Sequence, residues 1–141
     1  MKTSDFSRLR RLLLCAAGFA ALTTSAFAHH SFGAIFDDKQ ELELHGVLTK
    51  VQWINPHSYY YVDVKNENGT TTTWAFESFP PAMMKRLGLT RDALTSQIGN
   101  KVKVLYNPAH DRAKPLGYSR VFEFEDGKRI IFTPEGVTGS E

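Results

Sequence analysis

A regular alternation of apolar and polar residues is the feature that most narrows the folds open to this chain. It runs through Ser58 to Lys65, where Tyr60, Val62 and Val64 share one phase, and it returns in Lys101 to Tyr106. Because successive side chains of a strand point to opposite faces, a period of two predicts half-buried β-strands. We therefore expect a mainly β protein.

The first predicted strand spans Glu41 to Trp53 and changes phase around Gly46. Leu42 and Leu44 precede the glycine in one phase, and Val47 follows it in the other. A glycine at such a slip predicts a β-bulge that bends a long strand.

Two dipeptides predict hairpins. Asn68-Gly69 has the composition of a two-residue turn and precedes a third predicted strand, Thr71 to Glu77. Asp126-Gly127 separates a pair of predicted strands, Tyr118 to Glu125 and Lys128 to Phe132. Both hairpins imply antiparallel neighbours.

Proline and glycine mark a helical crossing between the third and fourth strands. Pro80-Pro81 opens a short predicted helix from Ala82 to Leu87, and Thr90 caps a second turn that continues to Leu94. The stretch from Asn107 to Pro115 is predicted as a polar loop. This order favours a small antiparallel OB-like barrel of five to six strands, with one short helical segment between strands three and four. A flatter α+β sheet with a helix on one face is the alternative.

The segment 1–28 has the three parts of a secretory signal peptide. A basic start is followed by an apolar run from Leu12 to Leu22 and by the small-x-small sequence Ala26-Phe27-Ala28. Cleavage after Ala28 leaves one β-barrel-like domain at 29–133, a flexible tail at 134–141 and no membrane anchor. The predicted location is the periplasm or the exterior. Arg10-Arg11 leaves both the general secretory and the twin-arginine routes open.

Removal of the signal changes the charge of the chain and its cysteine content. Of the 17 basic residues four lie in the signal, and of the 15 acidic residues one does, so positions 29–141 carry a net charge of −1. A protein without a basic surplus is not expected to bind nucleic acid. The only cysteine, Cys15, is lost as well, which leaves no disulfide or thiolate chemistry.

Five segments of the chain resemble a family of small secreted bacterial domains of unknown function. They are His29-His30-Ser31-Phe32, Trp53-x-Asn55-Pro56-His57, Trp74-Ala75-x-Glu77, Leu87-Gly88-Leu89-Thr90-Arg91-Asp92-x-Leu94 and Asn107-Pro108-Ala109. The resemblance covers nearly the whole mature chain and implies an exported single domain. It brings no activity or substrate with it. Family members often carry tryptophan at the position of Leu89.

Signal cleavage would give His29 a free α-amino group beside its imidazole. Two such nitrogens can chelate one metal ion, and a further histidine would complete a set suited to copper. This arrangement resembles the histidine brace of copper-dependent polysaccharide oxygenases and of some periplasmic copper carriers. The predicted metal ligands are His29, His30 and His57, with His110 as a further candidate. The alternative is that the histidine pair is only a polar chain end.

A second candidate site surrounds the sequence Trp53-Ile54-Asn55-Pro56-His57. In an OB-like barrel the loop between strands one and two borders the usual binding face. We predict ligand contacts from residues of this loop and of strands two and three: Trp53, Asn55, His57, Tyr59 and Glu77. The alternatives are an ordinary Asn-Pro turn, a core role for Trp53 and Trp74, and a loop hydrogen bond for His57.

Three functions remain open. The first is a non-enzymatic binding or accessory domain for a small molecule, and the second is a copper-binding protein that uses His29. The third is an interaction module that binds another exported protein. No nucleophile-elbow, HExxH or paired-carboxylate motif is present, so we expect no catalytic residues.

Overall fold

The computed structural model describes residues 32–132 and 139–140. The chain divides into two units, Met1–Ala34 and Ile35–Glu141, and the second holds all the named elements. In chain order these are β1 (Leu42–Gln52), β2 (Ser58–Lys65), β3 (Thr71–Ser78), α3 (Pro81–Arg86), α4 (Arg91–Thr95), β4 (Lys101–Pro108), β5 (Leu116–Phe124), β6 (Arg129–Ile131) and β7 (Gly139–Ser140). None of the helices in this part of the chain is long and apolar enough to cross a bilayer.

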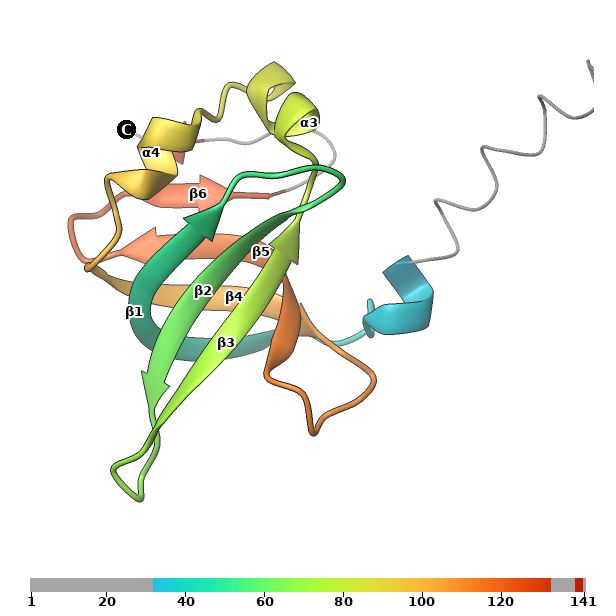
Figure 1. The fold of residues 1–141 in the computed structure, drawn as a ribbon, viewed down its shortest axis with the longest axis vertical. Helices are drawn as coiled ribbons and strands as arrows, with labels where there is room; N and C mark the ends of the chain where they lie inside the picture. Colours follow the sequence, from blue (N-terminus) through green and yellow to red (C-terminus); the bar gives the residue numbers. More distant parts are fainter. Residues whose placement is uncertain (1–31, 133–138, 141) are drawn as a thin grey trace, which may run out of the picture. The chain divides into compact units, whose positions relative to one another are not determined.

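The strands form one sheet that closes on itself (Figure 1). Their order is β3-β2-β1-β4-β5-β6-β7, and β3 also pairs with β5, so five strands make a ring and β6 and β7 extend it. The OB-like barrel expected from the sequence is confirmed. One feature differs, because the closing pair of β3 and β5 is parallel and the barrel is therefore mixed.

β1 pairs with a different strand along each half of its length. Its first half pairs with β4 and its second half with β2, and Val47 belongs to both ladders. The predicted bulge at Gly46 is wrong, because the register shift lies between Leu48 and Lys50. A glycine is required at position 46 for a steric reason instead. A Cβ atom there would lie 2.5 Å from the carbonyl oxygen of Asp63. The glycine lets β2 approach β1 closely.

Both predicted hairpins are present, but the first loop is longer than two residues. Asn66 donates its backbone N–H to Thr70 at 2.9 Å, and Gly69 donates to Asn66 at 3.0 Å with a φ of 83°. This is a turn followed by a left-handed glycine. The resulting register pairs Lys65 with Thr71.

The helical crossing agrees with the sequence, whereas the fourth strand is longer than predicted. α3 begins at Pro81, and Thr90 caps α4 by accepting the N–H of Ala93 at 3.2 Å. Both helices lie at one end of the barrel (Figure 1). β4 includes Asn107 and Pro108, which were expected in a loop. Asn107 is buried, and its amide donates to the backbone oxygen of Gln40 at 2.8 Å.

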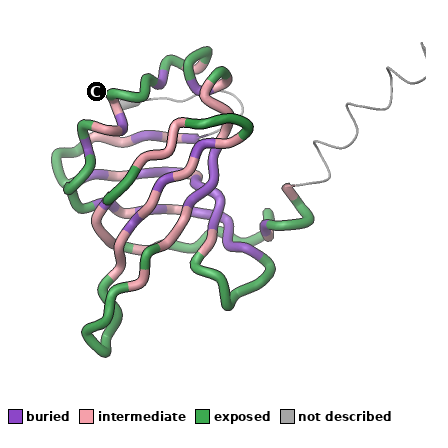
Figure 2. The backbone as a smooth tube through the Cα atoms, in the orientation of Figure 1, coloured by how far each residue is buried: buried purple, intermediate pink, exposed green. Residues whose placement is uncertain are grey.

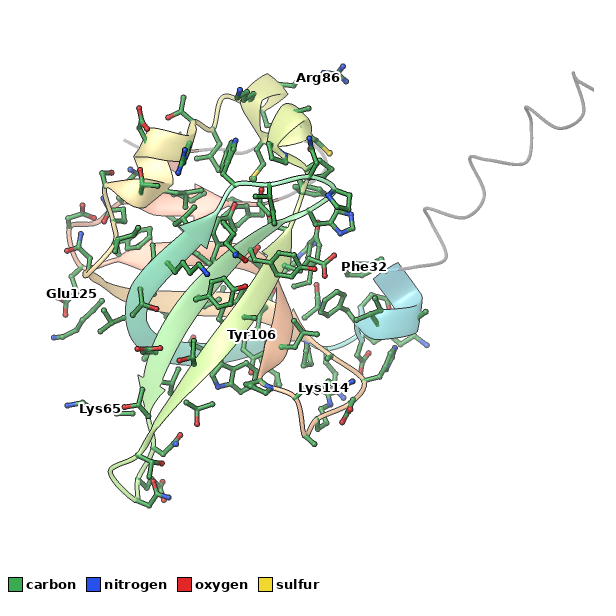
Figure 3. All side chains as sticks on the ribbon, in the orientation of Figure 1. Phe32, Lys65, Arg86, Tyr106, Lys114 and Glu125 are labelled. Atoms are coloured by element: carbon green, nitrogen blue, oxygen red, sulfur yellow. The ribbon has the colours of Figure 1, made fainter. Side chains whose placement is uncertain are left out.

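Aromatic rings fill the barrel, and Figure 2 shows the buried positions running along the strands while the tip of the β2–β3 hairpin is exposed. The ring of Phe122 contacts those of Tyr60, Phe76 and Phe132 at centroid distances of 5.2 to 6.3 Å. Side chains at the two ends of the barrel, such as Lys65 and Arg86, point to solvent (Figure 3).

Candidate functional site

The loop between β1 and β2 lies at the end of the barrel that carries α3 (Figure 1). Its end is fixed by the backbone N–H of Ser58, which donates to the oxygen of Phe79 at 3.3 Å. Ile54 is 49% exposed. Asn55 and Pro56 are also exposed and are joined by a cis peptide bond. The loop therefore presents an apolar and an amide side chain to solvent.

A hydrogen-bonded row of three side chains follows this loop, and we call it the His57–Glu77–Tyr59 row. The hydroxyl of Tyr59 donates to Oε2 of Glu77 at 2.9 Å. Nδ1 of His57 lies 2.5 Å from Oε1 of the same carboxylate. Glu77 is only 8% exposed, whereas the side chain of His57 is 42% exposed.

The pairing of β2 with β3 explains why these side chains meet. The register places Tyr59 opposite Glu77 and Tyr60 opposite Phe76. Tyr60 and Phe76 are fully buried and fill the barrel. Because side chains alternate along a strand, their neighbours Tyr59 and Glu77 are left on the outer face.

β5 supports Glu77 from the other side. The parallel register places Tyr118 opposite Glu77, and the hydroxyl of Ser119 donates to the backbone oxygen of Glu77 at 3.0 Å. Neither residue was among the predicted ligand contacts, because nothing in the local sequence pattern predicts that β3 and β5 meet.

The carboxylate of Glu77 and the packing around it shift the acidity of two tyrosines. Burial, the hydrogen bond to Glu77 and the negative charge of Glu77 raise the pKa of Tyr59 to about 12. Burial raises the pKa of Tyr118, and the charge of Glu77 raises it further. Both hydroxyls therefore keep their protons far above neutral pH.

The outer face of β2 continues with a second tyrosine. The hydroxyl of Tyr61 donates to Oε1 of Gln52 at 2.6 Å, and Nζ of Lys50 lies 5.0 Å from the centroid of the Tyr61 ring. Polar groups thus extend from the His57–Glu77–Tyr59 row along the outside of the barrel.

The two tryptophans lie against the core. Trp53 is half-buried and packs against the core residues, and its indole nitrogen is buried with no hydrogen-bond partner among the described residues. Trp74 contacts the rings of Phe76 and Tyr106 at 6.1 and 5.5 Å, in agreement with the core role considered for it. Of the predicted ligand contacts, the structure brings together His57, Tyr59 and Glu77.

The predicted metal ligands are only partly described. His29 and His30 lie outside the described residues. Among residues 32–132 there is no group of three histidine, cysteine, aspartate or glutamate side chains that could hold a metal ion. Within the same residues, Nε2 of His57 makes no hydrogen bond. Of the two nitrogens of the His57 ring, Nε2 is therefore the one that could bind a metal ion.

The segment that precedes β1 is anchored to the barrel through Phe36. Phe36 pairs with Ala109, and its ring lies 5.6 Å from that of Tyr118. Tyr118 in turn stands opposite Glu77. The ring of Phe36 therefore packs against the residue that is paired with Glu77 across the β3–β5 ladder.

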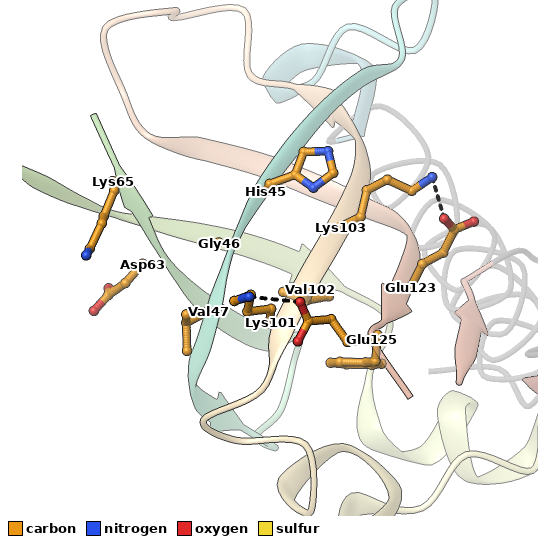
Figure 4. Close-up of a pocket in the computed structure, with 11 residues that line it drawn as sticks. His45, Gly46, Val47, Asp63, Lys65, Lys101, Val102, Lys103, Glu123 and Glu125 are labelled. Atoms are coloured by element: carbon orange, nitrogen blue, oxygen red, sulfur yellow. Dashed lines mark hydrogen bonds and ion pairs between the residues drawn. The ribbon is translucent and has the colours of Figure 1, made fainter. Parts of the chain in front are cut away.

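A hollow of about 630 Å³ lies elsewhere on the barrel, over β1, β2, β4 and β5 (Figure 4). Its walls carry both charges, and the charges are matched within it. Nζ of Lys101 lies 2.9 Å from Oε1 of Glu125, and Lys103 pairs with Glu123. Because these pairs satisfy each other, the hollow has no excess charge that would select a ligand class.

Comparison with known proteins gives one match, to a protein family. The sequence matches a family of unknown function over residues 17–117. No curated protein and no solved structure matches it.

Proposed function

The chain belongs to this family of unknown function, DUF6152, and we propose that it is an exported binding or accessory domain without enzymatic activity. Its ligand is a small molecule that binds at the loop between β1 and β2. The observation that carries the proposal is the His57–Glu77–Tyr59 row.

The burial of Glu77 is costly unless the carboxylate has partners, since a glutamate is seldom this buried when unpaired. His57 and Tyr59 supply two partners, and the buried acid in return orients both side chains. The side chain of His57 nevertheless remains 42% exposed. A polar group that faces solvent and is held by a buried partner is typical of a binding site.

The adjoining loop adds the other contacts that a small-molecule site needs. Asn55 offers an exposed amide, and Ile54 offers an exposed apolar side chain. Trp53 closes the loop against the core. This mixture of apolar surface and a few fixed polar groups favours an organic ligand that combines an apolar part with a polar group.

The proposal of export rests on the signal-like sequence, which lies outside the described residues. We expect mass spectrometry of the protein purified from the periplasm to show a mature chain that begins at His29. A chain that retains residues 1–28, or that is found only in the cytosol, would contradict export.

The binding function is tested with a library of small metabolites, added to the mature protein and followed by NMR shifts of its backbone amides. We expect at least one compound to shift the amides of residues 53–59. His57→Ala and Asn55→Ala should abolish those shifts in protein that remains folded. The melting temperature should be unchanged in Asn55→Ala and lowered in His57→Ala, because His57→Ala removes one partner of the buried Glu77 carboxylate.

His45→Ala is the matched control. His45 is also an exposed histidine next to a glutamate, with Nε2 2.8 Å from Oε1 of Glu43, but it lies in the half of β1 that pairs with β4. Its loss should leave binding unchanged. Binding that survives His57→Ala, or that is lost equally in His45→Ala, would place the ligand elsewhere.

Copper binding is a second candidate, which the contact between His57 and Glu77 favours. A metal-binding histidine usually donates its other ring nitrogen to a carboxylate or carbonyl group, and Nδ1 of His57 lies on Glu77 in this way. The α-amine and imidazole of His29 would supply the other nitrogens.

Copper analysis of the mature protein tests this candidate. We expect one tightly bound Cu²⁺ per chain, lost in His29→Ala and weakened in His57→Ala, with His45→Ala unchanged. A mature protein that stays metal-free when copper is offered would reject the copper function and leave small-molecule binding intact.

A further inference from the structure

We infer that Glu77 is a positioning residue that fixes the tautomer of His57, with the proton on Nδ1 and the lone pair of Nε2 facing the ligand. The ligand class follows from this assignment. The site takes a group that accepts an electron pair at Nε2, which is a hydroxyl or ammonium hydrogen or a metal ion. The inference rests on the proposed binding at His57.

The hydrogen-bonding capacities of the three groups lead to this tautomer. An ionised carboxylate only accepts hydrogen bonds. Oε2 of Glu77 receives the hydroxyl of Tyr59, and Oε1 faces Nδ1 of His57 at 2.5 Å. A short contact between a ring nitrogen and a carboxylate oxygen requires the proton on that nitrogen. In a neutral imidazole the other nitrogen is then an acceptor.

Tyr59 makes the arrangement asymmetric. Because its hydroxyl occupies Oε2, the carboxylate is held with Oε1 turned to the histidine. The backbone of Glu77 is fixed as well, by the hydroxyl of Ser119. The side chain that sets the tautomer is thus held at both of its ends.

Charge narrows the ligand class further. No lysine or arginine within the described residues forms an ion pair with Glu77. Its negative charge therefore lies directly behind the neutral imidazole, with no ion-paired lysine or arginine among these residues to offset it. This field favours a positive or hydrogen-bond-donating group at Nε2 and disfavours carboxylates and phosphates.

The same protein contains a natural comparison. His45 contacts Glu43 through Nε2 rather than Nδ1, and both side chains are at least half exposed. His45 therefore contacts its carboxylate through the other ring nitrogen, and both side chains of this pair are exposed to solvent. We expect its ring to carry the proton on Nε2.

The test is a long-range ¹H–¹⁵N NMR spectrum of the ¹⁵N-labelled mature protein at about pH 8, where an ordinary histidine is neutral. The expected result is the Nδ1–H pattern for His57 and the Nε2–H pattern for His45. Glu77→Ala should shift His57 to the Nε2–H form that solvated histidine prefers, and Tyr59→Phe should retain Nδ1–H. If Glu77→Ala does not fold, the wild-type and Tyr59→Phe spectra decide.

Two probes and one control anion test the ligand class on the same signals. Zn²⁺ represents the metal source and methylammonium the hydrogen-bond donor source, and acetate is the anion that the site should reject. We expect one or both of the first two to perturb Nε2, with affinity reduced about 10- to 100-fold in Glu77→Ala. An Nε2–H pattern in the wild type, or a response to acetate as strong as to either cation, would overturn the inference. A correct tautomer with no ligand from the metabolite library would instead reject the proposed function.

Discussion

Gly46 occupies a position of the barrel that has no room for a side chain. A Cβ atom there would lie 2.5 Å from the oxygen of Asp63 and 2.6 Å from Cγ1 of Val62. Gly46→Ala should therefore push β2 away from β1 and lower the free energy of unfolding by about 1–3 kcal/mol. Urea denaturation measures the change.

The matched control is Thr71→Ala, an exposed strand position, which should change the free energy of unfolding by less than about 0.5 kcal/mol. Equal losses in the two variants would show that the contact with Asp63 is relaxed at little cost.

Tyr59 and Tyr118 give the stability a dependence on alkaline pH. The unfolded tyrosine titrates near its ordinary pKa of 10.0, whereas Tyr59 in the folded protein titrates at about 12. Between these values the unfolded state binds fewer protons, so stability falls as pH rises. The contribution is complete below pH 10.0 and is lost as pH rises through about 12. Tyr118 acts in the same direction.

Urea midpoints measured from about pH 8 to about pH 12 should decline above pH 10 in the wild type, and less steeply in Tyr59→Phe. Identical slopes in the two proteins would mean that Tyr59 ionises as freely in the fold as outside it.

Among the elements, α4 depends most directly on one side chain. The hydroxyl of Thr90 accepts the N–H of Ala93 at 3.2 Å and caps a helix of only five residues. Thr90→Ala should cost about 1 kcal/mol of unfolding free energy in urea titration, while Thr90→Ser keeps the cap and most of the stability. Two equal losses would show that the methyl group of Thr90 matters more than its hydroxyl.

The β2–β3 hairpin shows how an element can be predicted while its register is not. The sequence places both strands correctly, because alternation and turn residues are local signals. A two-residue turn at Asn68-Gly69 would pair Glu67 with Thr70 and set Tyr59 against Ser78. The longer loop moves the register by one, so Tyr59 stands opposite Glu77. A shift of one residue exchanges the two faces of a strand.

At the scale of the whole molecule, one ring contributes to most of the core. Phe122 is fully buried and contacts rings from β2, β3 and the segment after β6. Phe122→Ala should cost about 3–5 kcal/mol of unfolding free energy, because the cavity cannot collapse against strands fixed on all sides. Leu42→Ala, at a position 42% exposed, should cost far less in the same denaturation assay. Similar costs would mean that the barrel repacks around the gap.

The sequence predicts the barrel itself but not how it closes. Alternation, glycines and prolines indicate the strands and the helical crossing, and these are short-range features. The parallel pairing of β3 with β5 depends on the fit of the complete barrel. Tyr118 and Ser119 could not be assigned to the site for this reason. His57 and Glu77 were both predicted as ligand contacts, although their direct contact was not.

The parallel closure also has a consequence for the order of folding. Tyr59 and Glu77 are 18 positions apart, whereas Ser119 and Glu77 are 42 positions apart. Contacts close in sequence cost less chain entropy and generally form sooner than distant ones. The hairpin that carries His57, Tyr59 and Glu77 can therefore assemble while the ends of the barrel are still separate. Closure of the barrel then fixes an arrangement of side chains that the hairpin has already formed.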